Sequence, residues 1–406
     1  MPVTIDDIKG AAKSIAGEVV KTPVVHSHSL SDMLGAEVYL KLENLQRTGA
    51  FKDRGALVKL KSLDEDANQA GVIAVSAGNH AQGVALHASR LGIPSTIVMP
   101  KDTPFTKVNR TQAMGARVVL HGDSFNDCQP HAEKLMKKEG LTFVHPFDDD
   151  TIIAGQGTIG LELMETVPDL DAIICPLGGG GLLSGVATAT KAMRSRTEVF
   201  GVEAELYPSM YQAIHGLEST AGGETIAEGI AVKEPGKRTR PIIEEHVDGI
   251  FLASELAIES AIETMLDQTK TVVEGAAAAP LAALQEHQAR FAGKKIALVV
   301  SGANISSRLL ASILMRSLVR TGRITRLRIT MSDNPGALAS VAHHIGDTGG
   351  NIVEIVHQRL FYDVPVKSTQ ADIVVETRDQ SHVREIVTRL TAAGFPCRQL
   401  GDTASS

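Results

Sequence analysis

The sequence of 406 residues has no tryptophan, and aromatic residues make up only 3% of it. Proteins that bind single-stranded nucleic acid stack the bases on aromatic rings within a positively charged groove. This chain offers few rings, and its net charge of -7 leaves no basic field for phosphates. We therefore expect no nucleic-acid partner.

Cysteine is also scarce. The three cysteines, Cys128, Cys175 and Cys397, lie far apart and form no C-x-x-C pair, which argues against a disulfide framework and against a zinc site. The residues from Met1 to Val20 mix acids and lysines with apolar residues, so they lack the apolar core of a signal peptide and the length of a membrane span. We expect a cytoplasmic protein with no membrane partner.

What the chain does contain, as far as Leu318, is a repeated pattern of short apolar runs, glycine-rich turns and alanine-rich helical stretches. Residues 71–92, GVIAVSAGNHAQGVALHASRLG, read as strand, turn and helix, and PSTIVMP follows as the next strand. Apolar strands that alternate with helices are typical of α/β proteins, in which helices cover both faces of a parallel sheet. Ligands of such sheets bind at the carboxyl ends of the strands, where these turns lie.

A different pattern begins near Arg323. RITRLRIT alternates as a half-buried strand, DNPGALASVAHHIGDTG is a turn leading into a helix, and NIVEIVHQRL is a second strand. STQADIVVET, SHVREIVTRLTAAG and PCRQL then give strand, helix and strand. The order βαββαβ predicts a ferredoxin-like domain at residues 323–401. The tail, residues 402–406, is expected to be disordered.

The most unusual lysine is Lys52, in the stretch LENLQRTGAFKDRGA. It stands between Phe51 and Asp53, with Gly49 and Gly55 on either side. A lysine is usually a solvated surface residue. Lys52 alone therefore does not indicate a functional site, and other motifs are needed.

Three of the predicted turns join a strand to a helix. GGGG, residues 178–181, presents backbone N–H groups at the positive end of a helix and suits a phosphate, although a simple tight turn remains an alternative. It is not a Walker loop, and it lacks the third glycine of a dinucleotide fingerprint, so Glu203 downstream supports a nicotinamide site only weakly. SAGNHAQG from Ser76 could hold a carboxylate or form an ordinary helix cap.

The third turn, SGANIS, begins at Ser301 and presents a hydroxyl. Together, the three turns and Lys52 suggest a phosphorylated small molecule, an anionic substrate and an amine nucleophile, as in Schiff-base chemistry.

The four motifs resemble those of the fold-type II pyridoxal-phosphate enzymes, in the same order, and the resemblance covers nearly all of residues 1–318. Within that family the chain is most similar to the threonine and serine dehydratases, or ammonia-lyases. The C-terminal segment, with DNPGAL at its first turn, resembles an ACT domain, a module that binds amino acids and regulates enzymes.

The resemblance implies a catalytic region at residues 1–320, with a smaller domain inserted at about 55–145, followed by the ACT domain. It also implies a homodimer or homotetramer, a small amino-acid substrate and an amino-acid effector. The predicted regulatory residues are Asp333, Asn334, Pro335, Gly336, Ala337 and Leu338.

The resemblance also assigns roles to single residues. Lys52 binds pyridoxal phosphate covalently and later takes the Cα proton of the substrate, Phe51 packs against the cofactor ring, and Asn79 donates to its 3'-oxygen. The phosphate is held by the backbone of Gly178, Gly179, Gly180, Gly181 and Leu182. The substrate carboxylate is held by Ser76, Ala77, Gly78, Asn79 and His80.

Ser301 is expected to face the pyridine nitrogen. A hydroxyl there stabilises the protonated pyridine less than a carboxylate does, which favours β-elimination over transamination. Ala77 stands where serine racemases of the family carry a serine, so racemisation is disfavoured. Glu203 is followed six residues later by Ser209 and not by the aspartate of the family's cation site, so no metal is expected.

The leading hypothesis is a threonine ammonia-lyase that converts L-threonine to 2-oxobutanoate and ammonium, and L-serine to pyruvate. Alternatives in the same family are a threo-3-hydroxyaspartate dehydratase and a serine dehydratase or racemase. An alternative of another class is an amino-acid sensor with an inactive catalytic half. The resemblance suggests isoleucine or valine as effector, and leaves open a role in isoleucine biosynthesis or in threonine breakdown.

Overall fold

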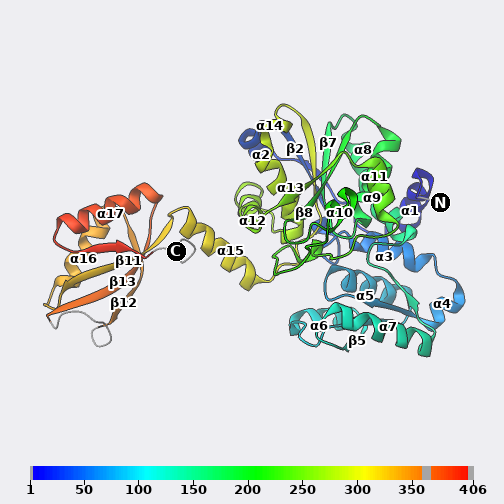
Figure 1. Ribbon diagram of the computed structural model, residues 1–406, viewed down its shortest axis with the longest axis horizontal. Coiled ribbons are helices and arrows are strands. Elements are labelled where there is room, and N and C mark those ends of the chain that lie inside the picture. Colours follow the sequence, from blue (N-terminus) through cyan, green and yellow to red (C-terminus); the bar gives the residue numbers. More distant parts are fainter. Residues whose placement is uncertain (1–2, 359–366, 401–406) are drawn as a thin grey trace. The chain divides into compact units, whose positions relative to one another are not determined.

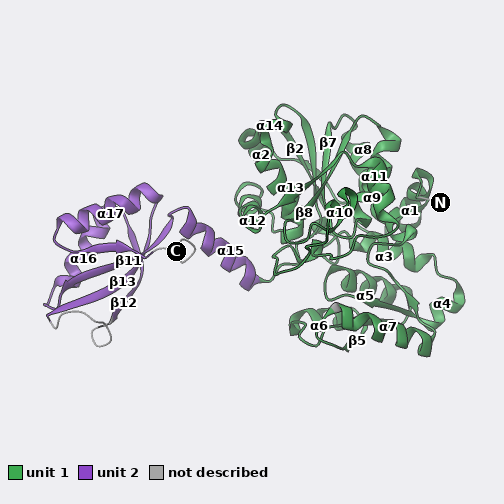
Figure 2. Ribbon diagram, in the orientation of Figure 1, with its two compact units in different colours: residues 1–306 green, residues 307–406 purple. Residues whose placement is uncertain are grey.

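The computed structural model describes residues 3–358 and 367–400. The chain divides into two compact units, residues 1–306 and residues 307–406 (Figure 2). The predicted limits of the catalytic region (1–320) and of the ACT domain (323–401) stay predictions. The predicted disordered tail, residues 402–406, lies outside the described residues.

The first unit is built of alternating strands and helices. Its helices are α1 (Ile5–Ile15), α2 (His28–Leu34), α3 (Lys52–Lys61), α4 (Glu65–Ala70), α5 (Asn79–Leu91), α6 (Phe105–Ala113), α7 (Phe125–Glu139), α8 (Asp150–Thr166), α9 (Gly181–Met193), α10 (Ser209–His215), α11 (Thr239–His246), α12 (Glu255–Thr269), α13 (Gly275–Glu286) and α14 (Gln288–Phe291), with 3-10 helices η1 (Glu43–Leu45) and η2 (Glu228–Ile230). Its strands are β1 (Val24–His26), β2 (Glu37–Leu42), β3 (Val72–Val75), β4 (Ser95–Met99), β5 (Arg117–Leu120), β6 (Thr142–Phe143), β7 (Ala172–Pro176), β8 (Glu198–Ala204), β9 (Gly249–Ala253) and β10 (Lys295–Val300).

The larger sheet of this unit has the strand order β1-β2-β10-β7-β8-β9. All neighbouring strands are parallel except β1, which runs antiparallel to β2. Helix α13 packs on β10, β7 and β8, and α9 packs on β7 and β8; the two helices lie on opposite sides of the sheet in Figure 1. Every residue of β7 is buried, as expected for a strand covered on both faces. The predicted α/β class is confirmed.

The smaller sheet has the order β5-β4-β3-β6, and all its strands are parallel. Alternate residues of β3 face different helices: Val72 and Ala74 pack with Val84 of α5, whereas Ile73 packs with Cys128 of α7. The four strands lie within the range predicted for the inserted domain.

Helices α3, α8 and α9 approach one another closely because glycines line their contacts. A Cβ atom on Gly155 of α8 would lie 2.6 Å from the Cα of Gly55 in α3, and one on Gly185 of α9 would lie 2.5 Å from the backbone nitrogen of Gly157 in α8. Any side chain there would force the helices apart. This packing fixes α3, and with it Lys52 at its first position.

The second unit contains one antiparallel sheet. Its elements are α15 (Ser307–Arg320), β11 (Ile324–Ser332), α16 (Ala337–Gly346), β12 (Asn351–Gln358), β13 (Ser368–Glu376), α17 (Gln380–Ala392) and β14 (Cys397–Gln399). The strand order is β12-β13-β11-β14, so from β11 onward the chain has the predicted βαββαβ arrangement. Leu327 and Ile329 of β11 form its core with Val341 of α16 and Ile386 of α17.

No helix within residues 3–358 and 367–400 is long and apolar enough to cross a membrane.

The close contact of α3 with α8 can be tested with two glycine substitutions. Gly155→Ala should lower the free energy of unfolding by about 1 to 3 kcal/mol, because the new methyl group overpacks the helix contact. The matched control is Gly10→Ala in α1, where a Cβ meets nothing within 4 Å; it should raise stability by up to about 1 kcal/mol. Thermal and urea unfolding followed by circular dichroism measure both. Equal effects of the two substitutions would contradict the close contact.

Candidate active site

The turn before Lys52 is held by the turn that follows β10. The backbone N–H of Phe51 donates to the Ser301 carbonyl at 3.0 Å, and the N–H of Ala303 donates to the Gly49 carbonyl at 2.9 Å. The two turns therefore form a short bridge at the carboxyl end of the sheet, and they bring Lys52 and Ser301 together. The Ser301 residue is buried.

The Lys52 amine lies in a confined position. Its Nζ donates to the carbonyl of Pro146 at 2.6 Å and lies 5.1 Å from the centre of the Phe51 ring. Burial lowers the pKa of Lys52 from its usual 10.5 to about 8, and the nearby Glu274 carboxylate opposes this shift. An amine with this pKa is unprotonated near neutral pH in a far larger fraction than an ordinary lysine, and its unprotonated form can act as a nucleophile or a base.

Two histidines near Lys52 are neutral. Burial lowers the pKa of His80 to about 3, and Lys52 adds to the effect. Burial also lowers the pKa of His145, whose Nδ1 accepts the backbone N–H groups of Phe147 and Asp148. Neither ring places a positive charge beside the amine.

The turn at the start of α5 brings the Asn79 side chain between Glu274 and Asn304. The Asn79 Nδ2 donates to Oε1 of Glu274 at 2.8 Å, and the Asn79 Oδ1 accepts from Nδ2 of Asn304 at 2.6 Å. A Cβ on Gly83, one turn later, would lie 3.2 Å from the Lys52 carbonyl oxygen. Helix α5 thus packs against the lysine itself.

The remaining residues of this turn have different surroundings. The backbone N–H of Gly78 donates to Oγ of Ser76 at 3.3 Å, and Ala77 packs against the core of the smaller sheet. The ring of His80 is buried and donates through Nε2 to the Val144 carbonyl at 2.8 Å. The His80 side chain therefore supports the fold, and only its backbone N–H is left for a substrate.

The glycine loop joins β7 to α9. Gly180 has a φ of 95° and caps α9 without a side-chain hydrogen bond, so the first N–H groups of a thirteen-residue helix have no side-chain cap. A Cβ on Gly179 would lie 2.4 Å from the Phe147 ring, and one on Gly181 would lie 2.8 Å from the Phe147 carbonyl. Because Phe147 follows Pro146, residues 146–147 contact the lysine and the glycine loop at once. Leu182 points into the core of the larger sheet.

These features fit a phosphate ester that carries an aldehyde. The uncapped start of α9 offers backbone N–H groups to a phosphate, and Lys52 offers an amine of lowered pKa to an aldehyde. The amide of Asn79 and the hydroxyl of Ser301 add neutral polar groups. The residues present therefore fit pyridoxal phosphate.

Sequence reasoning missed several residues of this site. Glu274 has no role in the sequence-based prediction. It is an acid directly before the apolar, alanine-rich stretch GAAAAPLAAL, and a lone charge beside such a stretch could have indicated a buried functional carboxylate. Burial raises the pKa of Glu274 to about 7, while the Asn79 donor opposes this. Pro146 acts through its carbonyl, which every residue type has, so no sequence signal could reveal it.

The predicted absence of a metal concerned Glu203 and Ser209. Glu203 accepts the backbone N–H groups of Met210 and Tyr211 at 2.8 and 2.9 Å, at the start of α10. Burial raises its pKa to about 7. Within residues 3–358 and 367–400, no cluster of three or more His, Cys, Asp or Glu residues could hold a metal ion.

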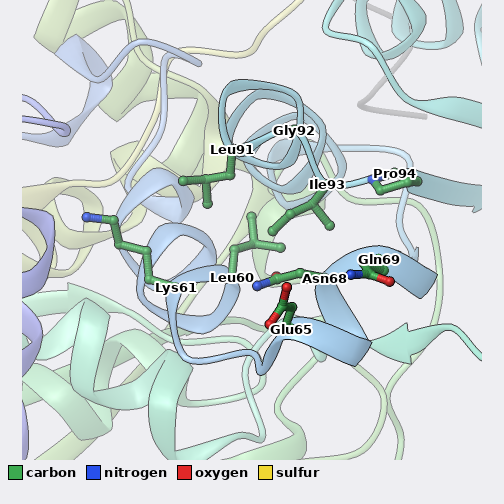
Figure 3. A pocket seen from close by; sticks show the side chains of 9 residues that line it. All are labelled: Leu60, Lys61, Glu65, Asn68, Gln69, Leu91, Gly92, Ile93 and Pro94. Atoms are coloured by element: carbon green, nitrogen blue, oxygen red, sulfur yellow. The ribbon is translucent and has the colours of Figure 1, made fainter.

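A surface pocket of the first unit lies apart from this site. It has a volume of about 450 Å³ and is lined by Leu60, Lys61, Glu65, Asn68, Gln69, Leu91, Gly92, Ile93 and Pro94 (Figure 3). Leu60 and Lys61 end the helix that Lys52 begins, and at 1.5 Å per residue the two ends are about 13 Å apart.

Of the predicted regulatory residues in the second unit, 333–336 join β11 to α16, and Ala337 and Leu338 are the first two residues of α16. Gly336 has a φ of 88° and precedes α16, and a Cβ there would meet nothing within 4 Å. The N–H of Ala337 donates to the Asn334 carbonyl at 3.2 Å. The structure brings these residues together in one turn.

Comparisons with known proteins identify the family of this chain. The family model described as pyridoxal-phosphate dependent enzyme matches residues 15–302. An L-threonine ammonia-lyase of Thermotoga maritima is 42% identical over 98% of this chain and 100% of its own length. A catabolic L-threonine dehydratase of Escherichia coli is 43% identical over 75% of this chain and 94% of its own length.

Solved structures give the same result. The crystal structure of a threonine deaminase from T.th. is 41% identical, has a TM-score of 0.71 and is matched over 75% of this chain and 99% of that chain. A serine racemase from Dictyostelium discoideum is 37% identical, with a TM-score of 0.71 and the same coverage. The lysine, the glycine loop and these similarities lead to one conclusion: the chain belongs to the family of pyridoxal-phosphate dependent enzymes.

Proposed function

We propose that the chain is a pyridoxal-phosphate dependent lyase that removes ammonia from L-threonine, giving 2-oxobutanoate and ammonium, and that also accepts L-serine. The observation that carries the proposal is the Lys52 amine, which has a lowered pKa and donates to the carbonyl of Pro146, next to the Phe147 that lies against the glycine loop. The proposal is supported by two L-threonine ammonia-lyases that are 42% identical over 97 to 98% of the chain.

The proposal assigns a role to each residue of the site, and the positions of these residues support the assignment. Pyridoxal phosphate, when bound to Lys52, supplies an electron sink for charge that develops at the Cα atom of the substrate. The backbone of residues 178–182 would hold the phosphate, Phe51 would pack on the ring and Asn79 would donate to the 3'-oxygen. Residues 76–80 hold the substrate carboxylate through their backbone N–H groups and the Ser76 hydroxyl.

The Lys52 amine would serve as the base that takes the proton from the Cα atom of the substrate. Its hydrogen bond to the Pro146 carbonyl fixes the direction of the nitrogen, and its lowered pKa leaves a substantial unprotonated fraction near pH 8. The neutral rings of His80 and His145 add no competing charge. Ser301 would offer a neutral hydroxyl to the pyridine nitrogen, which would favour loss of the β-hydroxyl group over transamination.

A serine racemase is the second candidate, because a racemase structure is 37% identical to this chain. Ala77 argues against it, since an alanine side chain has no proton to exchange with the second face of Cα. Chiral chromatography of a serine reaction distinguishes the two functions. Ammonium with little D-serine supports the lyase, and D-serine formed as fast as ammonium supports the racemase.

We further propose that the second unit is an ACT domain that binds an amino-acid effector, with isoleucine or valine as the first candidates, at Asp333 to Leu338. The Escherichia coli dehydratase leaves roughly a quarter of this chain unmatched, which supports a control role for the additional part. A homodimer or homotetramer in the cytoplasm is part of the same proposal.

The covalent link between Lys52 and the cofactor can be tested directly. Borohydride reduction of the holoenzyme should trap the cofactor on Lys52, and Lys52→Ala should reduce turnover of threonine by at least about 10² to 10⁴-fold, because the general base is lost. Lys61→Ala, at the other end of the same helix, is the matched control and should keep both properties. Peptide mapping that finds the label on another lysine would show that the site is misassigned.

The pKa of Lys52 can be tested on protein freed of cofactor. The methylation rate of Lys52 should increase with pH, with a midpoint near pH 8. The methylation rate of the exposed Lys21 serves as the reference for the reactivity of the reagent. Because native Lys52 loses its proton at lower pH than in the unfolded chain, its contribution to stability should increase between pH 8 and 10.5. A midpoint at 10.5 would contradict the burial of the amine.

Regulation can be tested by removing the second unit. A chain ending at Ser306 should keep cofactor binding and threonine deamination but lose any response to isoleucine or valine. A coupling of about 1 to 3 kcal/mol, roughly fivefold to 150-fold in apparent affinity, is expected in the intact chain. Rates are titrated with each of the twenty amino acids.

Gly336→Trp should abolish the same response in the full chain. Gly394→Trp is the matched control, because Gly394 also has a positive φ and open space around its Cβ position. An effector response that survives removal of the second unit would place the regulatory site elsewhere.

A further inference from the structure

Four side chains of the first unit form a continuous series of hydrogen bonds, which we call the amide relay. Nη1 of Arg110 donates to Oδ1 of Asn304 at 2.8 Å. Nδ2 of Asn304 donates to Oδ1 of Asn79 at 2.6 Å, and Nδ2 of Asn79 donates to Oε1 of Glu274 at 2.8 Å. Arg110 belongs to α6, Asn79 begins α5, Asn304 follows β10, and Glu274 precedes α13.

The donors and acceptors around the relay allow only one orientation of each asparagine amide. A guanidinium group can only donate, so Arg110 requires the oxygen of the Asn304 amide to face it. The nitrogen of Asn304 then faces the Thr48 carbonyl at 3.0 Å, which can only accept, and the oxygen of Asn79. The amide of Asn79 must therefore turn its nitrogen toward Glu274.

Glu274 is built into its place as an acceptor. Its own backbone N–H donates to the Gly302 carbonyl at 3.1 Å, and a Cβ on Gly302 would lie 2.5 Å from Oε1 of Glu274. The carboxylate also accepts the backbone N–H of Asn304. Two donors, one from Asn79 and one from Asn304, are thus aimed at one carboxylate.

We propose that Glu274 and Asn304 are positioning residues of the cofactor site, which fix the Asn79 amide so that it presents an N–H to the 3'-oxygen of pyridoxal phosphate. This proposal rests on the proposed function. With one N–H engaged by Glu274 and the oxygen engaged by Asn304, the second N–H is the one donor that the Asn79 amide has left. A reversed amide would present its oxygen to the 3'-oxygen, and two acceptors repel each other.

The relay is tested from both ends. Glu274→Gln leaves one side-chain oxygen, where the carboxylate has two, to accept from the Asn79 amide and the Asn304 backbone N–H. Asn304→Asp replaces the nitrogen that faces Asn79 with an acceptor, and so favours the reversed Asn79 amide. The matched control is Glu228→Gln, which removes a nearby charge that acts on Glu274 but whose carboxylate pairs with Lys107, outside the relay. Circular dichroism establishes that each variant folds.

The readout is a ratio of affinities in the full chain freed of cofactor. Pyridoxal phosphate and its analogue without the 3-hydroxyl group are titrated separately by absorbance and fluorescence. Glu274→Gln and Asn304→Asp should each reduce the preference for pyridoxal phosphate over the analogue by about tenfold, the worth of one hydrogen bond to a charged oxygen. Glu228→Gln should leave the preference unchanged.

The outcomes separate three cases. A purely structural role of Glu274 and Asn304 would weaken both ligands equally and keep the wild-type preference, which would overturn the proposal. If one variant fails to fold, the other decides the question, since each acts on Asn79 from a different side. If the wild type binds neither ligand, the proposed function fails, and that result is distinct from a preference that the variants do not change.

Discussion

The position of Lys52 depends on a buried cation two residues later. The guanidinium of Arg54 is fully buried and donates to Glu43 at 2.8 and 2.9 Å and to Glu162 at 2.8 and 2.9 Å. Lys41 donates to the same Glu162 at 2.5 Å. Burial alone would raise the pKa of Glu43, but Arg54 holds it below its usual value. Removing one partner of such a pair leaves an uncompensated buried charge, which costs about 3 to 5 kcal/mol.

The ion cluster of Arg54, Glu43, Glu162 and Lys41 joins β2, η1, α3 and α8 at one point. The glycine contacts between α3 and α8 hold the helices close enough for these ion pairs to form. The buried ion pairs and the close packing of the helices therefore depend on each other, and together they fix the first turn of α3. A lysine held so firmly can keep its amine against the Pro146 carbonyl and need not spread over many rotamers.

The parts of the site that the sequence predicted are those made within one short segment. The lysine motif, the SAGNH turn and the glycine loop each form a local structure whose chemistry is readable in a few residues. The sequence did not predict the contacts between these segments. Asn79 and Glu274 are 195 residues apart, and Arg110 and Asn304 are 194 apart, so their meeting depends on how two sheets pack. The buried ring of His80 shows the same limit, because its hydrogen-bond partner Val144 directly follows β6, 64 residues further along the chain.

The same burial that lowers the pKa of Lys52 and His80 raises that of Glu274, so the site disfavours charge of either sign unless it is paired. This explains why a hydroxyl suits position 301. Gly302, the next residue, lies against the Glu274 carboxylate, and a second carboxylate at 301 would add like charge to a poorly solvated site. A neutral Ser301 avoids that repulsion and, in the proposed arrangement, would leave the pyridine nitrogen without an anionic partner. The electrostatic environment that activates the lysine thus also supports elimination as the reaction of this site.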